Sequence, residues 1–343
     1  MMDLHRKFDN ALKDTVNEWK KRSEVKGIFT YGSVVKGTAT TNSDLDLVII
    51  WAGDEAPARL LAEHRGVVVD MDFLTPAKIE EIFDDKEDHP FTVAGVISRL
   101  KDARVEFDRE GIVKAWLQKA ATYRWTERNM ENVKHKALNG LKRSDELLAS
   151  GDVVSAVHEM RRGIFDLGRL VLMRNNVFSI IKPSEVLSDV RMLDPTVYKL
   201  FLRTFRLKGL DEGKLLAILE DVRGWLEKSI DLFERSEDIT PESPVGAHLT
   251  QAQRYYYGAQ SQTLNGDFEL AILEMRRAIS MIGMALLALH GNPVEENEAL
   301  MAKLRELEPE FYEQVMLQYG AFDLLPEGVQ RGIGEARFIA QQL

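Results

Sequence analysis

The chain has 343 residues, enough for two or three domains, and its 45% hydrophobic and 29% charged residues are typical of a globular protein. Its net charge of −10 argues against a surface for duplex DNA or bulk tRNA, and favours a neutral or cationic acceptor. The absence of cysteine excludes disulfides, thiolate zinc sites and cysteine nucleophiles.

The absence of cysteine also makes a reducing cytoplasm the simplest setting. The N-terminus lacks an apolar signal core, and no uninterrupted apolar stretch approaches the ~20 residues needed to cross a bilayer. We therefore expect a cytoplasmic protein with no membrane partner.

The first 111 residues alternate strand and helix patterns, which predicts a small α/β (α+β) domain. Short apolar runs predict strands at 26–31, 44–51, 66–74 and 103–107. Helices are expected at 4–21, at 56–64 and after Thr75-Pro76, where threonine suits the N-cap and proline the first turn.

One stretch of this domain carries the chemistry. A turn at Gly32-Ser33 leads, after a loop, to two carboxylates, Asp44 and Asp46, at the head of an apolar run. Alternate residues of a strand face the same way, so these carboxylates lie side by side and need a cation. The turn can offer backbone N–H groups and a hydroxyl to a phosphate. The pattern therefore predicts a magnesium–nucleotide site.

A Gly-Ser turn followed, roughly ten residues later, by Ser-Asp-x-Asp resembles the DNA polymerase beta-like nucleotidyltransferase superfamily. The likeness is closest to the minimal and aminoglycoside-type members and covers about residues 1–110. It implies a mixed sheet, two Mg²⁺ ions, and ATP or another nucleoside triphosphate as substrate.

The resemblance also implies a third carboxylate on a neighbouring strand. Asp70 and Asp72 share a face of the strand at 66–74, and both are candidates. The superfamily's usual apolar–any–apolar pattern after the third acid fits Asp70, whereas a Val-Asp-apolar-apolar-Thr-Pro pattern of some minimal members fits Asp72. We prefer Asp70 as the third catalytic acid. The predicted metal ligands are Asp44, Asp46, Asp70 and Asp72.

Four residues are predicted to bind the nucleotide. Gly32 and Ser33 would cradle the β- and γ-phosphates. Lys36 stands where relatives have a basic residue and would pair with phosphate, or it is a surface lysine. Ser43 would touch phosphate or cap its turn, and we favour the cap.

From residue 112 onward the strand signal disappears and the sequence repeats itself. Glu159-Met160-Arg161-Arg162 recurs 115 positions later as Glu274-Met275-Arg276-Arg277, and a second block, 191–198, recurs at an offset of 114. We predict two tandem all-α bundles, at 112–235 and 247–343, joined by a polar, proline-bearing linker at 236–244.

These copies resemble the bundle that follows kanamycin-type nucleotidyltransferase domains, and also HEPN-like bundles. Toxic HEPN ribonucleases carry a histidine four to six residues after an arginine, and the arginines here lack one, so we do not expect ribonuclease activity. Glu159 and Arg162, one helical turn apart, would form a surface ion pair. In the tyrosine run at 255–257 at least one side chain is expected to be exposed.

The leading hypothesis is a magnesium-dependent nucleotidyltransferase that moves a nucleoside monophosphate from ATP or another triphosphate to a hydroxyl of a small molecule or protein. The catalytic domain is 1–111, and the acceptor would bind between it and the first bundle. A homodimer is compatible with the second bundle. The alternative is an antitoxin-like or regulatory module that acts on a partner protein. Candidates for the general base are Glu131, Asp145, Glu146 and Glu159.

Overall fold

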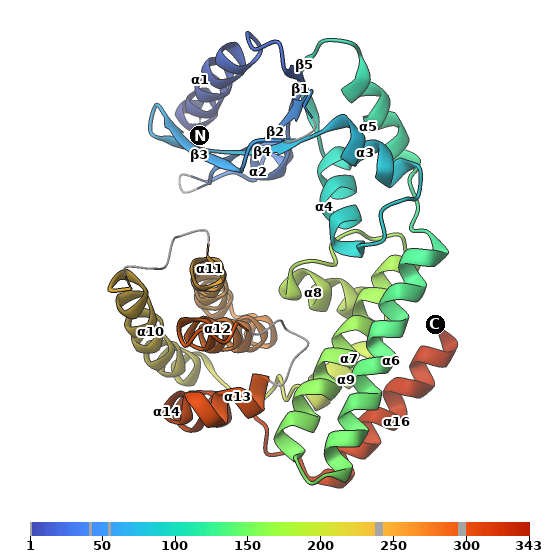
Figure 1. Cartoon of the computed structure of the whole chain (residues 1–343), viewed down its shortest axis with the longest axis vertical. Helices are drawn as coiled ribbons and strands as arrows, with labels where there is room; N and C mark the ends of the chain where they lie inside the picture. Colours follow the sequence, from blue (N-terminus) through green and yellow to red (C-terminus); the bar gives the residue numbers. More distant parts are fainter. Residues whose placement is uncertain (1, 41–42, 54–55, 237–242, 294–299) are drawn as a thin grey trace. The chain divides into compact units, whose positions relative to one another are not determined.

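The computed structural model describes residues 2–40, 43–53, 56–236, 243–293 and 300–343. The chain divides into two compact units, Met1–Met130 and Glu131–Leu343, which are taken in turn (Figure 1). None of the helices in the described ranges has the length and apolar character needed to span a membrane.

A mixed five-stranded sheet, in the order β3-β4-β2-β1-β5, forms the centre of the first unit. Strands β2 and β4 are parallel, and every other neighbouring pair is antiparallel. The strands are β1 Val25–Thr30, β2 Leu45–Trp51, β3 Leu60–His64, β4 Val67–Leu74 and β5 Arg104–Asp108. A mixed sheet followed by helices confirms the predicted fold class.

Helices cover this sheet and close its core. They are α1 Met2–Trp19, α2 Gly32–Lys36, α3 Pro76–Phe83, α4 Pro90–Lys101 and α5 Ile112–Thr122. Phe8 and Trp19 of α1 are buried against Ile28, Met71 and Phe73 of the sheet. At α3 the Thr75 hydroxyl accepts from the Lys78 N–H at 3.2 Å, which is the N-cap predicted from the sequence.

The predicted helix at 56–64 is wrong, because Leu60–His64 forms edge strand β3. Arg65 and Gly66 both have positive φ, 54° and 72°, and together they make the tight turn that folds β3 back onto β4. The residues of β3 favour a helix locally, but pairing with β4 satisfies their backbone groups and overrides that preference.

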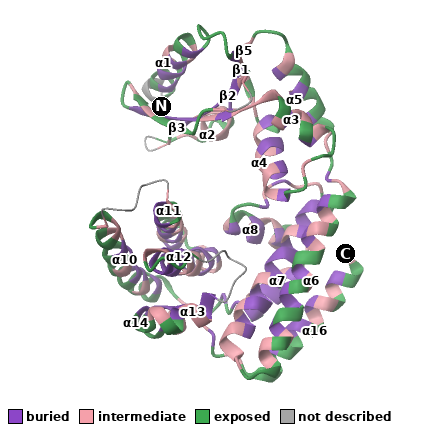
Figure 2. Cartoon of the chain, in the orientation of Figure 1, coloured by how far each residue is buried: buried purple, intermediate pink, exposed green. Residues whose placement is uncertain are grey.

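The second unit is helical. Its elements are α6 Glu127–Ala149, which begins just before the unit boundary, α7 Val153–Arg174, α8 Pro183–Leu193, α9 Pro195–Thr204, α10 Glu212–Glu234, α11 Pro244–Leu264, α12 Phe268–Leu289, α13 Leu300–Leu307, α14 Pro309–Phe311, the π-helix η1 Tyr312–Leu317, α15 Gln318–Gly320 and α16 Pro326–Gln342. Helices α7 and α12 are its most thoroughly buried long helices (Figure 2).

The boundaries at 111/112 and 235/247 stay predictions, and most of the expected linker, 237–242, lies outside the described residues. Two observations bear on them. Helix α5 packs on β1 and β5, and so accompanies the sheet. The C-terminal helix α16 packs on α7 and α9, so the end of the chain covers helices of the predicted first bundle.

Two arginines, the buried Arg161 and the half-buried Arg276, join distant parts of the helical unit. Arg161 on α7 donates through Nε to the Thr204 carbonyl at 2.9 Å and through a terminal nitrogen to the Gly320 carbonyl at 2.7 Å. Arg276 on α12 donates through Nε to the Tyr319 carbonyl at 3.0 Å and also to the Phe205 carbonyl. Each arginine thus binds the ends of both α9 and α15, where helix carbonyls lack intrahelical partners.

Candidate active site

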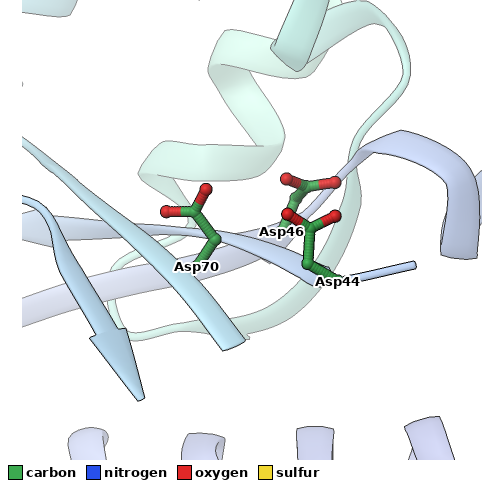
Figure 3. Close-up of side chains that lie close together, drawn as sticks. All are labelled: Asp44, Asp46 and Asp70. Atoms are coloured by element: carbon green, nitrogen blue, oxygen red, sulfur yellow. The ribbon is translucent and has the colours of Figure 1, made fainter. Parts of the chain in front are cut away.

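Strand register brings the predicted acids together. In the parallel pair β2–β4, Asp46 lies opposite Asp70, and Asp44 directly precedes β2. Figure 3 shows the three carboxylates on the same side of these strands. One oxygen from each of Asp44, Asp46 and Asp70 lies within 4.8 Å of the other two. The sequence-predicted pair and the preferred third acid therefore form one cluster.

The three acids differ in how far they are exposed to solvent and in whether a cationic side chain offsets their charge. Asp44 is exposed, Asp46 is half-buried, and Asp70 is only 4% exposed. Arg59, in the segment that leads into β3, donates from Nε to Asp70 Oδ1 at 2.6 Å and from a terminal nitrogen to Oδ2. This bidentate contact offsets the cost of burying the carboxylate, and the hydrogen bond to Asp70 raises the pKa of Arg59.

Asp72 stands outside this cluster. It lies opposite Val48 in the register, and its Oδ2 is 2.6 Å from a terminal nitrogen of Arg99 on α4. The Arg99 guanidinium also lies 5.1 Å from the centre of the Tyr31 ring. Arg59 Nε also lies 3.8 Å from Asp72 Oδ1, so both acids have cationic partners, but only Asp70 clusters with Asp44 and Asp46.

The Gly-Ser turn lies directly against the acid cluster. Gly32 opens α2 with φ of 77°, and a Cβ on it would come 2.2 Å from Asp46 Oδ2. The Tyr31 N–H donates to the Asp46 carbonyl at 3.3 Å, which fixes the turn to the start of β2. Only a glycine allows both the backbone conformation and this close approach.

The other two predicted nucleotide-binding residues contact protein groups. Lys36 pairs with Asp102 at 2.7 Å, and both side chains are exposed. The Ser43 hydroxyl accepts from the Thr40 N–H at 2.9 Å, a turn-capping contact. An exposed ion pair is weak and readily exchanged, so the Lys36 contact does not hold that side chain firmly.

In the helical unit, several residues singled out in the sequence have structural partners. Arg162 Nε donates to Glu159 Oε2 at 3.0 Å, so the expected pair forms, although Glu159 is buried rather than on the surface. Tyr256 is buried and Tyr257 is 62% exposed, which confirms that the tyrosine run is split between core and solvent. Asp145, a base candidate, pairs with Arg337 at 2.6 Å.

The acid cluster fits a divalent cation. Magnesium prefers carboxylate oxygens, and the cluster offers three from three separate residues. The two more accessible acids, Asp44 and Asp46, leave room for further oxygen ligands such as phosphates. Arg59 was missed in the sequence, because nothing local links an arginine in a loop to a carboxylate eleven residues later on a neighbouring strand.

The comparison with protein families agrees with this geometry. Residues 12–103 match the family model described as "Nucleotidyltransferase domain". No curated protein matches the chain. Among solved structures, a nucleotidyltransferase-like protein from Exiguobacterium sibiricum 255-15 aligns over 88% of this chain and 88% of its own, with 12% identity and a TM-score of 0.42. Residues 12–103 of this chain, with the turn and the acid cluster within them, therefore carry a nucleotidyltransferase domain.

Proposed function

We propose that the chain transfers a nucleoside monophosphate from ATP or another nucleoside triphosphate to a hydroxyl of a small molecule or protein, with magnesium. The observation that carries this proposal is the cluster of Asp44, Asp46 and Asp70 beside the Gly32 turn, inside a domain that matches the nucleotidyltransferase family. The net charge of −10 favours a neutral or cationic acceptor over a nucleic acid.

In this reaction the acceptor oxygen bonds to the α-phosphorus, and the bond from that phosphorus to the bridging oxygen breaks. Pyrophosphate leaves with the electron pair, and the hydroxyl proton passes to a base or to water. Asp44, Asp46 and Asp70 would hold the divalent ions, which offset charge on the attacking and leaving oxygens. Asp46, which contacts the Gly32 turn, would set the distance between metal ligands and phosphates.

The turn would position the triphosphate. Its backbone N–H groups and the Ser33 hydroxyl are donors beside the acid cluster, and the missing side chain of Gly32 allows close approach. Lys36, on the same short helix, would exchange its exposed Asp102 partner for a phosphate. We assign Ser43 to holding the loop before Asp44, through its contact with Thr40.

We also propose that the helical unit contains two copies of one bundle. Arg161 and Arg276 support it, because each donates to one carbonyl of its own copy and to one carbonyl of the other copy. The carbonyls of Thr204 and Tyr319, and of Phe205 and Gly320, are each 115 positions apart, like the arginines. The π-helix Tyr312–Leu317 lies where the offset changes from 114 to 115, and a π-helix accommodates one extra residue.

Calorimetry of ATP binding, in magnesium and in EDTA, tests the catalytic proposal. We expect binding in magnesium, a loss of at least tenfold in EDTA, and a comparable loss in Asp44→Asn, Asp46→Asn and Asp70→Asn in magnesium. Equal affinity for ATP in magnesium and in EDTA would contradict the proposal.

Asp72→Asn is the matched comparison for the third acid, since it removes a carboxylate from the same strand face. We expect it to retain magnesium-dependent binding within about threefold. A loss as large as that of Asp70→Asn would place Asp72 among the ligands. Asp102→Asn, which removes only the surface partner of Lys36, controls for general charge effects.

A further inference from the structure

The exposed large apolar side chains of the first unit gather on one hairpin. Among the described residues of that unit they are Leu60, Leu61 and Val68, and all three belong to β3 or β4. A single exposed leucine is common on a protein surface, whereas neighbouring exposed apolar side chains mark a contact surface. The β3–β4 hairpin is therefore a candidate contact surface.

Strand register divides these side chains between the two faces of the sheet. Leu61 lies opposite Asp70, so both point to the face that carries the acid cluster, and Val68, two positions before Asp70, shares that face. Leu60 lies opposite Met71, which belongs to the core under α1, so Leu60 points to the other face. Diagonal neighbours on one face of a strand pair are ~7–8 Å apart, so Leu61 and Val68 form one apolar surface.

This apolar surface adjoins the third acid. On the acid face, Asp70 has Asp46 opposite it on β2 and Leu61 opposite it on β3 (the two acids are labelled in Figure 3). Gly32 follows β1, on the other side of β2, and lies against Asp46. The order across the sheet is thus the Gly32 turn, Asp46, Asp70 and then Leu61, with neighbouring strands ~4.8 Å apart.

The geometry of nucleotidyl transfer gives the two ends of this row different partners. In an in-line displacement the attacking and leaving oxygens lie on opposite sides of the α-phosphorus. With the β- and γ-phosphates on the Gly32 turn, pyrophosphate leaves toward β1. The attacking hydroxyl then arrives from the side of Asp70 and β3, where Leu61 and Val68 are exposed.

We propose that the acceptor carries an apolar group close to its reacting hydroxyl, and that this group packs on Leu61 and Val68. The inference rests on the proposed transfer reaction and adds the class of acceptor, a small neutral or cationic alcohol with an aromatic or aliphatic part. Glu63, opposite Val68 on the same face, disfavours an anionic group there. One strand spacing separates Asp70 from Leu61, so the hydroxyl and the apolar group are only a few bonds apart.

A ligand-observed NMR titration of the full chain with 2-phenylethanol tests the proposal. Two carbons separate the hydroxyl of this probe from its ring. The titration contains magnesium and α,β-methylene ATP, whose carbon bridge prevents transfer. We expect 2-phenylethanol to bind, and glycerol, which lacks an apolar group, to bind at least about tenfold more weakly. Leu61→Ser should weaken the binding of 2-phenylethanol about fivefold, and Val68→Thr about threefold.

Leu60→Ser is the matched control, because it removes the same type of side chain from the neighbouring position on the opposite face. Leu60 is 42% exposed and Leu61 is 62% exposed, so both substitutions are made at the surface. Leu60→Ser should leave the affinity for 2-phenylethanol unchanged. The affinity for ATP in magnesium, measured by calorimetry, should be the same in the parent, Leu60→Ser and Leu61→Ser.

The two measurements separate this inference from the proposed function. Failure of the parent to bind ATP in magnesium would contradict the proposed function, whereas bound nucleotide without bound 2-phenylethanol overturns only the inference. The inference is also overturned if glycerol binds as tightly as 2-phenylethanol, if Leu61→Ser and Val68→Thr both leave the affinity intact, or if Leu60→Ser lowers it equally.

Two further results would overturn the inference by giving the apolar surface another occupant. A loss of ATP affinity in Leu61→Ser, but not in Leu60→Ser, would assign the surface to the nucleobase. Sedimentation that shows a dimer for the parent and a monomer for Leu61→Ser would assign the surface to a second copy of the chain.

Discussion

The carboxylate of Asp46 lies so close to Gly32 that a Cβ on the glycine would stand 2.2 Å from Oδ2. The two residues are fourteen positions from each other along the chain. Gly32 belongs to the turn of the predicted motif, and Asp46 belongs to its strand. Their close approach couples the turn that we propose to bind phosphate to the carboxylate that we propose to bind a metal.

Gly32→Ala is therefore expected to displace Asp46 and to abolish magnesium-dependent nucleotide binding. Gly37→Ala is the matched control: Gly37 also has positive φ, 72°, but nothing lies within 4 Å of its missing Cβ. Both variants pay a backbone cost of about 1–2 kcal/mol in unfolding free energy. Denaturant unfolding and ATP calorimetry should show similar stability losses but a binding loss only for Gly32→Ala. Equal binding losses would contradict the contact's role.

Arg59 is the counter-ion of Asp70. Arg59→Gln removes the bidentate partner of a carboxylate that is 4% exposed. We expect the unfolding free energy in EDTA to fall by on the order of 1–3 kcal/mol, because Arg59 itself is 45% exposed and partly screened. We also expect magnesium to stabilise this variant more than the parent chain, since the metal no longer competes with the guanidinium.

Thermal unfolding at rising magnesium concentrations measures both effects. Arg65→Gln is the control, because it removes an arginine of the same hairpin whose partner, Asp14, is exposed. It should leave the magnesium response unchanged. A magnesium-induced shift in Arg59→Gln that is smaller than in the parent would show that Arg59 supports metal binding.

The sequence predicts local features of this site better than non-local ones. Asp44 and Asp46 are two positions apart, so strand alternation alone places them on one face. The choice of Asp70 over Asp72 depends on the register of β2 with β4, which a family pattern suggests but local spacing does not determine. The Arg59 contact depends on the β3–β4 hairpin, which the helix-favouring residues at 56–64 concealed.

The same limit applies to the helical unit. The Glu-Met-Arg-Arg repeat is visible in the sequence, and its i,i+3 pair at Glu159 and Arg162 forms as expected. The charged residues of this repeat suggested that it lies on the surface. Arg161 is nevertheless buried, because carbonyls at the ends of α9 and α15 accept its hydrogen bonds. Such acceptors come from segments 43 and 159 residues away, and no local pattern reveals them.

Glu274 should make the helical unit sensitive to pH. Burial raises its pKa above the ordinary 4.5, so the folded chain binds this proton more tightly than the unfolded chain does. The resulting gain in unfolding free energy is fully present below pH 4.5, and it is lost as the pH rises through the raised pKa of Glu274 in the folded chain. Glu274→Gln keeps an acceptor for the Ser184 N–H, at 3.2 Å in the parent, without the buried charge.

We therefore expect the unfolding free energy of Glu274→Gln to depend less on pH above pH 4.5, and to exceed that of the parent at pH 7. Denaturant unfolding at pH 4, 5, 6 and 7 measures this. Glu220→Gln, an exposed carboxyl paired with Arg223 on α10, is the comparison and should follow the parent. A destabilised Glu274→Gln at pH 7 would mean that the buried charge is favourable.

The last prediction concerns the C-terminal helix, which packs on α7 and α9 of the predicted first bundle. A Cβ on Gly332 would come 2.7 Å from Met160 Sδ, whereas nothing lies within 4 Å of that position on Gly334, two residues further along the same helix. Gly334→Leu should stabilise the chain by about 0.5–1 kcal/mol through helix propensity. Gly332→Leu gains the same helix propensity but overpacks the contact with α7. Its unfolding free energy should therefore fall by about 1–3 kcal/mol net. Denaturant unfolding of both variants measures the difference.

If Gly332→Leu is as stable as Gly334→Leu, the C-terminal helix is not part of the core around α7. If it is destabilised, removing the chain after Ser236 would strip cover from α7, so a truncated protein should unfold more easily than the full chain.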